Sequence, residues 1–260
     1  MNMSNRDLED LKYAKGLLEN PSIGSKLMDI LGSPIEKGFG LLPERWSGII
    51  QKATRISLEK ALYFAIKTIG KEGRNQSRDL LHKIAVTFSG FVGGTFGLEA
   101  LPVELPVSTT IMLRSICDIA KSEGENIELI ETRLACLEVF ALGGKSKRDN
   151  ASETGYYVIR SALAKTVSEA SNYIAEKGLV IEKGAPAIVK LITGIASRFG
   201  IVVSEKAAAL AIPGIGALGA ALINMTFMDH FQDMARGHFI VRRLERFYGK
   251  EIVQQEYARL

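Results

Sequence analysis

Cysteine and histidine are both scarce: the 260 residues include two cysteines and three histidines. Two cysteines cannot build a disulfide framework or a structural zinc site, so the chain is typical of a reducing compartment. Three histidines leave little room for a histidine-rich metal centre, and we predict neither a metal nor a cofactor. Residues 1–10 are polar and acidic, unlike the basic start and apolar core of a secretory signal. We therefore expect a cytoplasmic protein.

Strand-like alternation of β-branched and polar residues is also rare, whereas apolar residues recur at helical spacing along the chain. The pattern predicts an all-α protein, a single multi-helix bundle. We expect amphipathic helices over residues 1–75 and a helical core over 76–260, packed as one compact domain. Pro106 is expected at the first position of a helix over 107–122, where its missing N–H is not needed.

Concentrated charge of one sign is nearly absent, because a net charge of +4 is spread over the whole chain. This excludes an evident nucleic-acid footprint, and we predict no nucleic-acid partner. One basic cluster lies near the C-terminus, in Arg236, Arg242, Arg243 and Arg246. These side chains are candidates for a basic surface that meets anionic lipid.

What the chain does have is glycine, 25 residues of it, together with a slightly positive mean hydropathy. The excess falls in two charge-free segments, 84–98 and 207–228. Crossing a bilayer takes about 20 apolar residues, and the first segment is too short while Pro213 interrupts the second. They are interpreted either as close-packed central hairpins or as membrane-contacting surfaces. Their glycines are Gly90, Gly93, Gly94, Gly97, Gly214, Gly216 and Gly219.

The second segment also contains G-x-G-x-x-G, from Gly214 to Gly219. This motif binds a dinucleotide when it follows a strand and opens a helix. Here the preceding residues, Lys206 to Ile212, favour a helix, and no β-α-β pattern surrounds them. Close helix packing explains these glycines better than nucleotide binding does.

One group of polar residues has the composition of a hydrolytic site, and it lies between the first glycine-rich segment and the following helix. Carboxylates beside apolar surface can have raised pKa values and act as acid and base. The simpler interpretation is that the same residues cap helices or form ion pairs. The group consists of Glu99, Glu104, Arg114 and Asp118.

The remaining reactive side chains give no further site. His230 and His238 are eight residues apart, about 12 Å along a helix, so one ion cannot bind both. Cys117 and Cys136 lie on apolar helical faces and are expected to be small core residues.

Several stretches between about Leu80 and Tyr248 form a combined pattern: Gly93 to Pro106, Leu113-Arg114 with Ile116 to Ala120, Phe140 to Gly143, Ile212 to Ala217, Asn224, Ala235, Phe239, and Arg242 to Glu245. Together they resemble the central signature of the EcsC family of bacterial proteins. The family takes its name from a gene beside those of an ABC exporter, and most members have no known biochemical role. Some members carry a peptidase label, but this sequence has no recognisable nucleophile or metal motif to support that label.

These observations leave three functions open. The first is a non-enzymatic protein bound peripherally to the cytoplasmic membrane or to a membrane-protein partner. The second is a peptidase-like hydrolase that uses Glu99, Glu104, Arg114 and Asp118. The third is a carrier of an apolar ligand or lipid.

Overall fold

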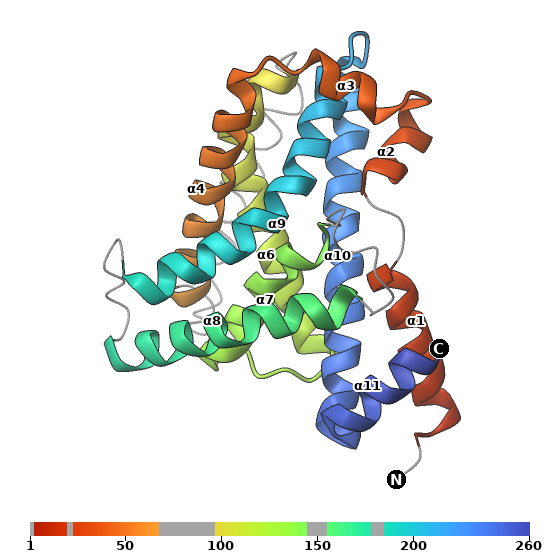
Figure 1. Cartoon of the computed structure of the whole chain (residues 1–260), viewed down its shortest axis with the longest axis vertical. Helices are drawn as coiled ribbons and strands as arrows, with labels where there is room; N and C mark the ends of the chain where they lie inside the picture. Colours follow the sequence, from red (N-terminus) through yellow and green to blue (C-terminus); the bar gives the residue numbers. More distant parts are fainter. Residues whose placement is uncertain (1–2, 20–22, 68–96, 145–154, 178–184) are drawn as a thin grey trace, which may run out of the picture.

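A computed structural model describes residues 3–19, 23–67, 97–144, 155–177 and 185–260, and all of these ranges consist of helices and short turns. The all-α prediction is confirmed for this part of the chain (Figure 1). The elements are α1 (Asn5–Glu19), α2 (Ile23–Leu31), α3 (Ile35–Leu41), α4 (Arg45–Lys67), the 3-10 helix η1 (Gly97–Ala100), α6 (Leu101–Ser122), α7 (Ile130–Leu142), α8 (Gly155–Lys177), α9 (Pro186–Ala211), α10 (Gly216–Tyr248) and α11 (Lys250–Arg259).

Helix α10 is 33 residues long and runs most of the length of the molecule (Figure 1). Helices α1 and α11 pack against it at the end that holds both chain termini, and α6 packs along it. The turn from α9 to α10 lies at the opposite end, near α3 (Figure 1). The two ends of α10 therefore stand in different surroundings.

An aromatic cluster holds α7, α9 and α10 together. Phe140, Phe199, Phe227 and Phe231 are buried, with neighbouring ring centroids 5.0 to 6.1 Å apart. Tilted and edge-to-face pairs of this kind stabilise a core beyond the area that they bury. This cluster fixes how α9 lies against the middle of α10.

Helix α6 begins six residues earlier than the sequence predicts. It starts at Leu101, so Pro102 lies in its first turn and Pro106 lies inside the helix instead of at its first position. Pro106 has no N–H to donate to the carbonyl of Pro102, which removes one helical hydrogen bond. Burial of Leu101 and Leu105 offsets that loss.

The glycines of the second charge-free segment form a turn and not a close-packed hairpin. Gly214 and Gly216 are exposed and have φ values of +86° and +61°, which favour glycine. A Cβ on Gly219 would meet only the side chain of Ile215. Helices α9 and α10 diverge from this turn (Figure 1). Close packing is therefore wrong for Gly214 and Gly216, and their exposure keeps the alternative of a contact surface.

The first charge-free segment falls almost entirely outside the described residues, including Gly90, Gly93 and Gly94. Gly97 is exposed with φ +41° and opens η1, which packs against α9 and α10. Close backbone approach occurs instead at Gly38, where a Cβ would lie 2.1 Å from the carbonyl oxygen of Ala208.

By length and composition, α9 is the one helix among the described residues that is apolar enough to cross a bilayer. One of its faces is buried against α3, α4, α7 and α8. A core helix of this kind has the same composition as a membrane span.

Candidate functional site

The structure separates the four polar residues of the predicted hydrolytic group. Glu99 is exposed and lies 3.9 Å from the guanidinium of Arg45. Glu104 is buried in the first turn of α6, whereas Asp118 is exposed in its last turns. Fourteen residues of helix place Glu104 and Asp118 about 21 Å apart along the axis, and Arg114 about 15 Å from Glu104. The group does not converge on one catalytic site.

Glu104 pairs with a residue that the sequence analysis missed. The Nζ atom of Lys206 lies 2.8 Å from Oε1 of Glu104, and the Lys206 side chain is 0% exposed. The same Nζ lies 4.5 Å from the centroid of the Phe227 ring. The sequence did contain a signal of this buried charge, because Lys206 lies among apolar residues near the end of α9. Removing two charges from water is costly, and the best-attested use of such a pair is to fix how elements align.

The four arginines of the predicted basic surface all have carboxylate partners. Arg236 lies 3.2 Å from Asp233 on the same helix. Arg243 lies 2.6 Å from Asp10 of α1 and 3.2 Å from Glu123. These pairs tie α1 and the α6–α7 loop to α10. The predicted basic surface is therefore paired with carboxylates of the protein itself, and the side chains of Arg236, Arg243 and Arg246 remain 40 to 46% exposed. Its contact with lipid stays a prediction.

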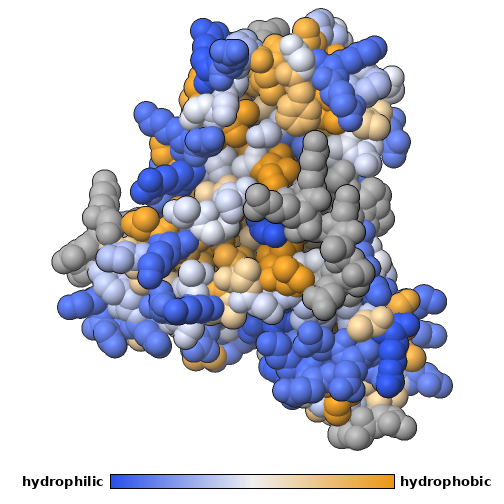
Figure 2. All heavy atoms as spheres, viewed as in Figure 1, coloured by the Kyte–Doolittle hydropathy of each residue, from blue (hydrophilic) through white to orange (hydrophobic). Residues whose placement is uncertain are grey.

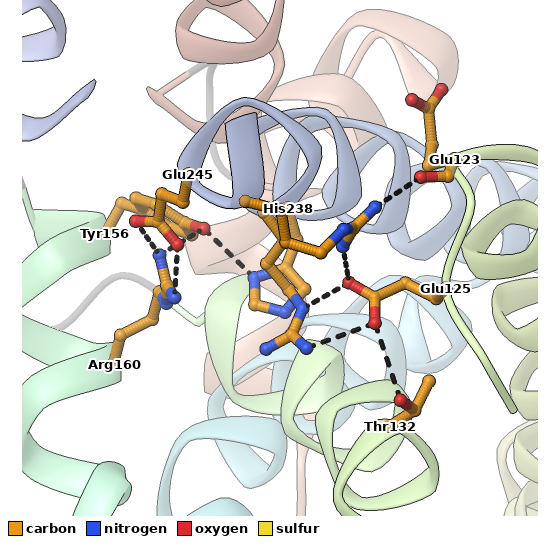
Figure 3. A network of polar contacts seen from close by, with 9 residues as sticks. Glu123, Glu125, Thr132, Tyr156, Arg160, His238 and Glu245 are labelled. Atoms are coloured by element: carbon orange, nitrogen blue, oxygen red, sulfur yellow. Dashed lines mark hydrogen bonds and ion pairs between the residues drawn. The ribbon is translucent and has the colours of Figure 1, made fainter. Parts of the chain in front are cut away.

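Glu125 is the centre of this charge network (Figure 3). Its carboxylate accepts hydrogen bonds from Nε of Arg242 at 2.7 Å and from Arg246, and a longer one from Thr132 at 3.4 Å. Burial alone raises the pKa of Glu125, but the bonds and charges of Arg242 and Arg246 outweigh it and hold the pKa below its ordinary value. Glu125 is thus charged at neutral pH and holds the α6–α7 loop on α10.

A second part of the network lies between α8 and α10 (Figure 3). Arg160 donates two hydrogen bonds to Glu245, at 2.8 and 2.9 Å. It also donates to the hydroxyl of Tyr156, which lies 3.1 Å from Nδ1 of His238. Burial first, and then Arg160 and Arg242, lower the pKa of His238, so the imidazole is neutral. We assign the tautomer in which Nδ1 accepts from Tyr156 and Nε2 carries the proton.

Glu138 of α7 is buried beside this network. Its surroundings are charged, since Arg160, Arg242 and Glu245 all act on it. Burial raises its pKa to about 7, although the two arginines oppose the shift. Among these buried charges, Glu138 is therefore the carboxyl group that gains or loses a proton near neutral pH.

The other candidates identified from the sequence have structural surroundings. His230 is buried, and its Nε2 lies 3.2 Å from the carbonyl oxygen of Gly143. His238 has a different partner, the hydroxyl of Tyr156. Cys117 and Cys136 are buried free thiols. The described residues contain no cluster of histidine, cysteine and carboxylate side chains that could hold a metal ion.

Large hydrophobic side chains are exposed at the end of the molecule that holds the α9–α10 turn. On α10, Leu218 is 78% and Met225 61% exposed, with Leu222 between them. Figure 2 shows hydrophobic surface at this end and along the middle of the same face, whereas the end with α1 and α11 is mostly hydrophilic. We call the following residues of α2, α3, α6 and α10 the apolar end: Ile30, Phe39, Leu41, Val103, Leu218, Leu222 and Met225.

Comparison with known proteins gives the class of the chain. The described part is a helical bundle with a charge network at one end and an apolar surface at the other. A sequence model described as the EcsC protein family matches residues 15–244. The chain belongs to the EcsC protein family. No curated protein and no solved structure matches it.

Proposed function

We propose that this EcsC-family protein is a non-enzymatic protein that binds peripherally to the cytoplasmic face of a membrane through the part of its apolar end that lies on α10. The observation that carries the proposal is the spacing of Leu218, Leu222 and Met225. They lie at positions i, i+4 and i+7 of α10, on one face of the helix, and all three are exposed. A helix that exposes apolar groups on one face along an uncharged stretch is suited to the membrane interface.

The composition of the apolar end favours lipid over a protein partner. Its members are aliphatic residues, one methionine and one phenylalanine, without tyrosine, tryptophan or arginine. Protein interfaces are enriched in tyrosine, tryptophan, phenylalanine, methionine and arginine and carry polar groups that select a partner. The apolar end holds two residues of these kinds, Phe39 and Met225. Residues 207–228 contain no charge. Such a surface can enter the interfacial region of a bilayer without burying an ion.

The charge network supports the same division of roles. Because Arg242, Arg243 and Arg246 pair with carboxylates of the protein itself, they contribute little free positive charge for anionic lipid. Binding through the apolar end is thus expected to depend weakly on salt, since salt screens charges and not hydrophobic contacts. The location at the cytoplasmic face accords with two buried free thiols.

Vesicle flotation tests the proposal. We expect the wild-type protein to float with phosphatidylcholine vesicles, with or without phosphatidylglycerol, at both low and high salt. The double variant Leu218→Gln/Met225→Gln removes two side chains from the interface. At about 1.5 kcal/mol or more for each, it should bind at least about tenfold more weakly.

The matched control carries the same replacements at exposed positions outside the apolar end. Leu129 and Phe247 are 53% and 73% exposed, so Leu129→Gln/Phe247→Gln changes a similar apolar surface. This control should float like the wild type. The proposal is overturned if the wild type stays with the soluble fraction, or if both double variants lose binding equally.

A further inference from the structure

Helix α3 presents apolar side chains on two faces. Its inner face buries Ile35 and Gly38 against α9, as expected for a helix that packs on the protein core. Outside that face, Phe39 is 43% and Leu41 49% exposed. A short helix on the surface of a globular protein normally directs polar residues outward. The apolar outward face of α3 therefore needs a second explanation.

The position of α3 is fixed relative to the α9–α10 turn. Gly38 meets the carbonyl of Ala208, three residues before the end of α9 at Ala211. A side chain at position 38 would clash there, so glycine allows α3 to lie directly on the last turns of α9. Phe39 and Leu41 are consequently held close to the residues that open α10.

Two polar contacts hold the preceding helix in the same way. The backbone N–H of Gly24 donates to Oε2 of Glu205 at 3.2 Å, at the start of α2. Lys26 lies 3.2 Å from Asp233 of α10. Both α2 and α3 are thus attached to the framework of α9 and α10, and α3 lies at the end of the molecule that holds the α9–α10 turn (Figure 1).

We propose that α3, with the end of α2, is the second half of one bilayer-docking face, so that the α9–α10 turn and α3 enter the membrane interface together. The occupant of this face is a lipid bilayer, and the inference rests on the proposed function. Two attachment points fix an orientation: α1 and α11, with both termini, point away from the membrane. Lys37 is exposed beside this face, next to the exposed Glu36, and a long cationic side chain there can reach the headgroups. Arg45 is also exposed, but it lies 3.9 Å from Glu99.

The single tryptophan provides a direct test. Trp46 is buried, and its indole N–H has no hydrogen-bond partner among the described residues, so Trp46→Phe forfeits no bond there. In that background, one tryptophan is introduced at Phe39, at Leu218 or at Phe247. Each protein is mixed with phosphatidylcholine–phosphatidylglycerol vesicles whose acyl chains are brominated near the headgroup. Circular dichroism confirms that each variant keeps its helices.

We expect bromine to quench the tryptophans of Phe39→Trp and Leu218→Trp by at least about twofold, because an interfacial helix lies at the depth of the upper acyl chain. The tryptophan of Phe247→Trp lies at the opposite end and should keep its emission. Quenching of Leu218→Trp without Phe39→Trp overturns this inference and leaves the proposed function standing. Failure of all three proteins to bind vesicles overturns the proposed function itself.

Two other outcomes also reject the inference. Equal quenching at all three positions indicates insertion without a defined orientation. A change in Phe39→Trp emission that follows protein concentration in the absence of lipid indicates that the face pairs with a second copy of the chain. Sedimentation velocity at the same concentrations identifies that dimer.

Discussion

The two halves of α10 present different kinds of side chain at the protein surface. Its first turns expose Leu218, Leu222 and Met225, whereas its last turns carry arginines that bind Glu123, Glu125 and Asp10. Charge would suggest that the arginine half is the binding surface. The cations of that half are already paired within the protein, which supports the proposal that the uncharged half is the binding surface. Exposure and pairing, more than charge, identify an interaction surface.

The largest effect is expected at Lys206 of α9, whose ammonium group pairs with Glu104 and lies 4.5 Å from the ring centroid of Phe227 of α10. Lys206→Met leaves Glu104 buried without its partner and should lower the free energy of unfolding by about 3 to 5 kcal/mol. The double variant Glu104→Leu/Lys206→Met removes both charges and should recover most of that loss. Urea denaturation of the two variants and the wild type gives the coupling energy.

Lys190→Met, at an exposed ion pair, is the control and should change stability by less than about 0.5 kcal/mol. A neutral Lys206→Met would show that the pair carries no such energy.

The charged half contains a titrating group, Glu138, and the sign of its effect follows from its raised pKa. The unfolded chain releases this proton near pH 4.5, but the folded protein holds it until about pH 7. The ionisable carboxyl thus lowers stability as pH rises from 4.5 to 7, by about 3 kcal/mol in all. Glu138→Gln should be more stable than the wild type by about that amount at pH 8 and equal to it near pH 4.

Thermal and urea unfolding across this pH range measure the difference. Glu176→Gln, at an exposed position of α8, should follow the wild type at every pH. A constant offset between Glu138→Gln and the wild type would mean that Glu138 does not titrate in this window.

Breaking the network at Glu125 should cost somewhat less. Glu125→Gln keeps the shape of the side chain but removes the charge that Arg242 and Arg246 share, which we expect to cost about 2 kcal/mol. Because the folded pKa of Glu125 is below its ordinary value, its contribution is present above the unfolded pKa and is lost as the pH falls through the folded pKa. Glu256→Gln breaks an exposed pair with Arg259 and should cost less than about 0.5 kcal/mol. Equal losses would contradict the distinction between paired interior and solvated charges.

The smallest effect is expected at the apolar end. Leu218→Gln/Met225→Gln replaces exposed side chains by another good helix former and should change the free energy of unfolding by less than about 0.5 kcal/mol. A loss above about 1 kcal/mol in urea would show that these side chains pack within the protein, and the end would not be open for binding.

Local sequence features anticipated many helices but not their surroundings. Helical periodicity predicted an all-α protein, and the helix expected over 107–122 corresponds to α6, which begins earlier, at Leu101. The prediction of a four-residue hydrolytic site failed because α6 begins at Leu101, and residues near one another in the sequence then lie far apart along this helix. The partner of Glu104 is 102 residues away, and no local pattern points to it.

The sequence by itself determined that the chain is helical and where its uncharged segment lies, because helical periodicity and residue composition are local properties. Only the tertiary structure decided which charges are neutralised and which apolar side chains stay exposed. Arg242 and Glu125 meet across 117 residues, and Gly38 lies on Ala208 only because α3 folds back on α9. Pairing and exposure depend on contacts between distant segments, and those contacts turn an evident basic surface into an internal network.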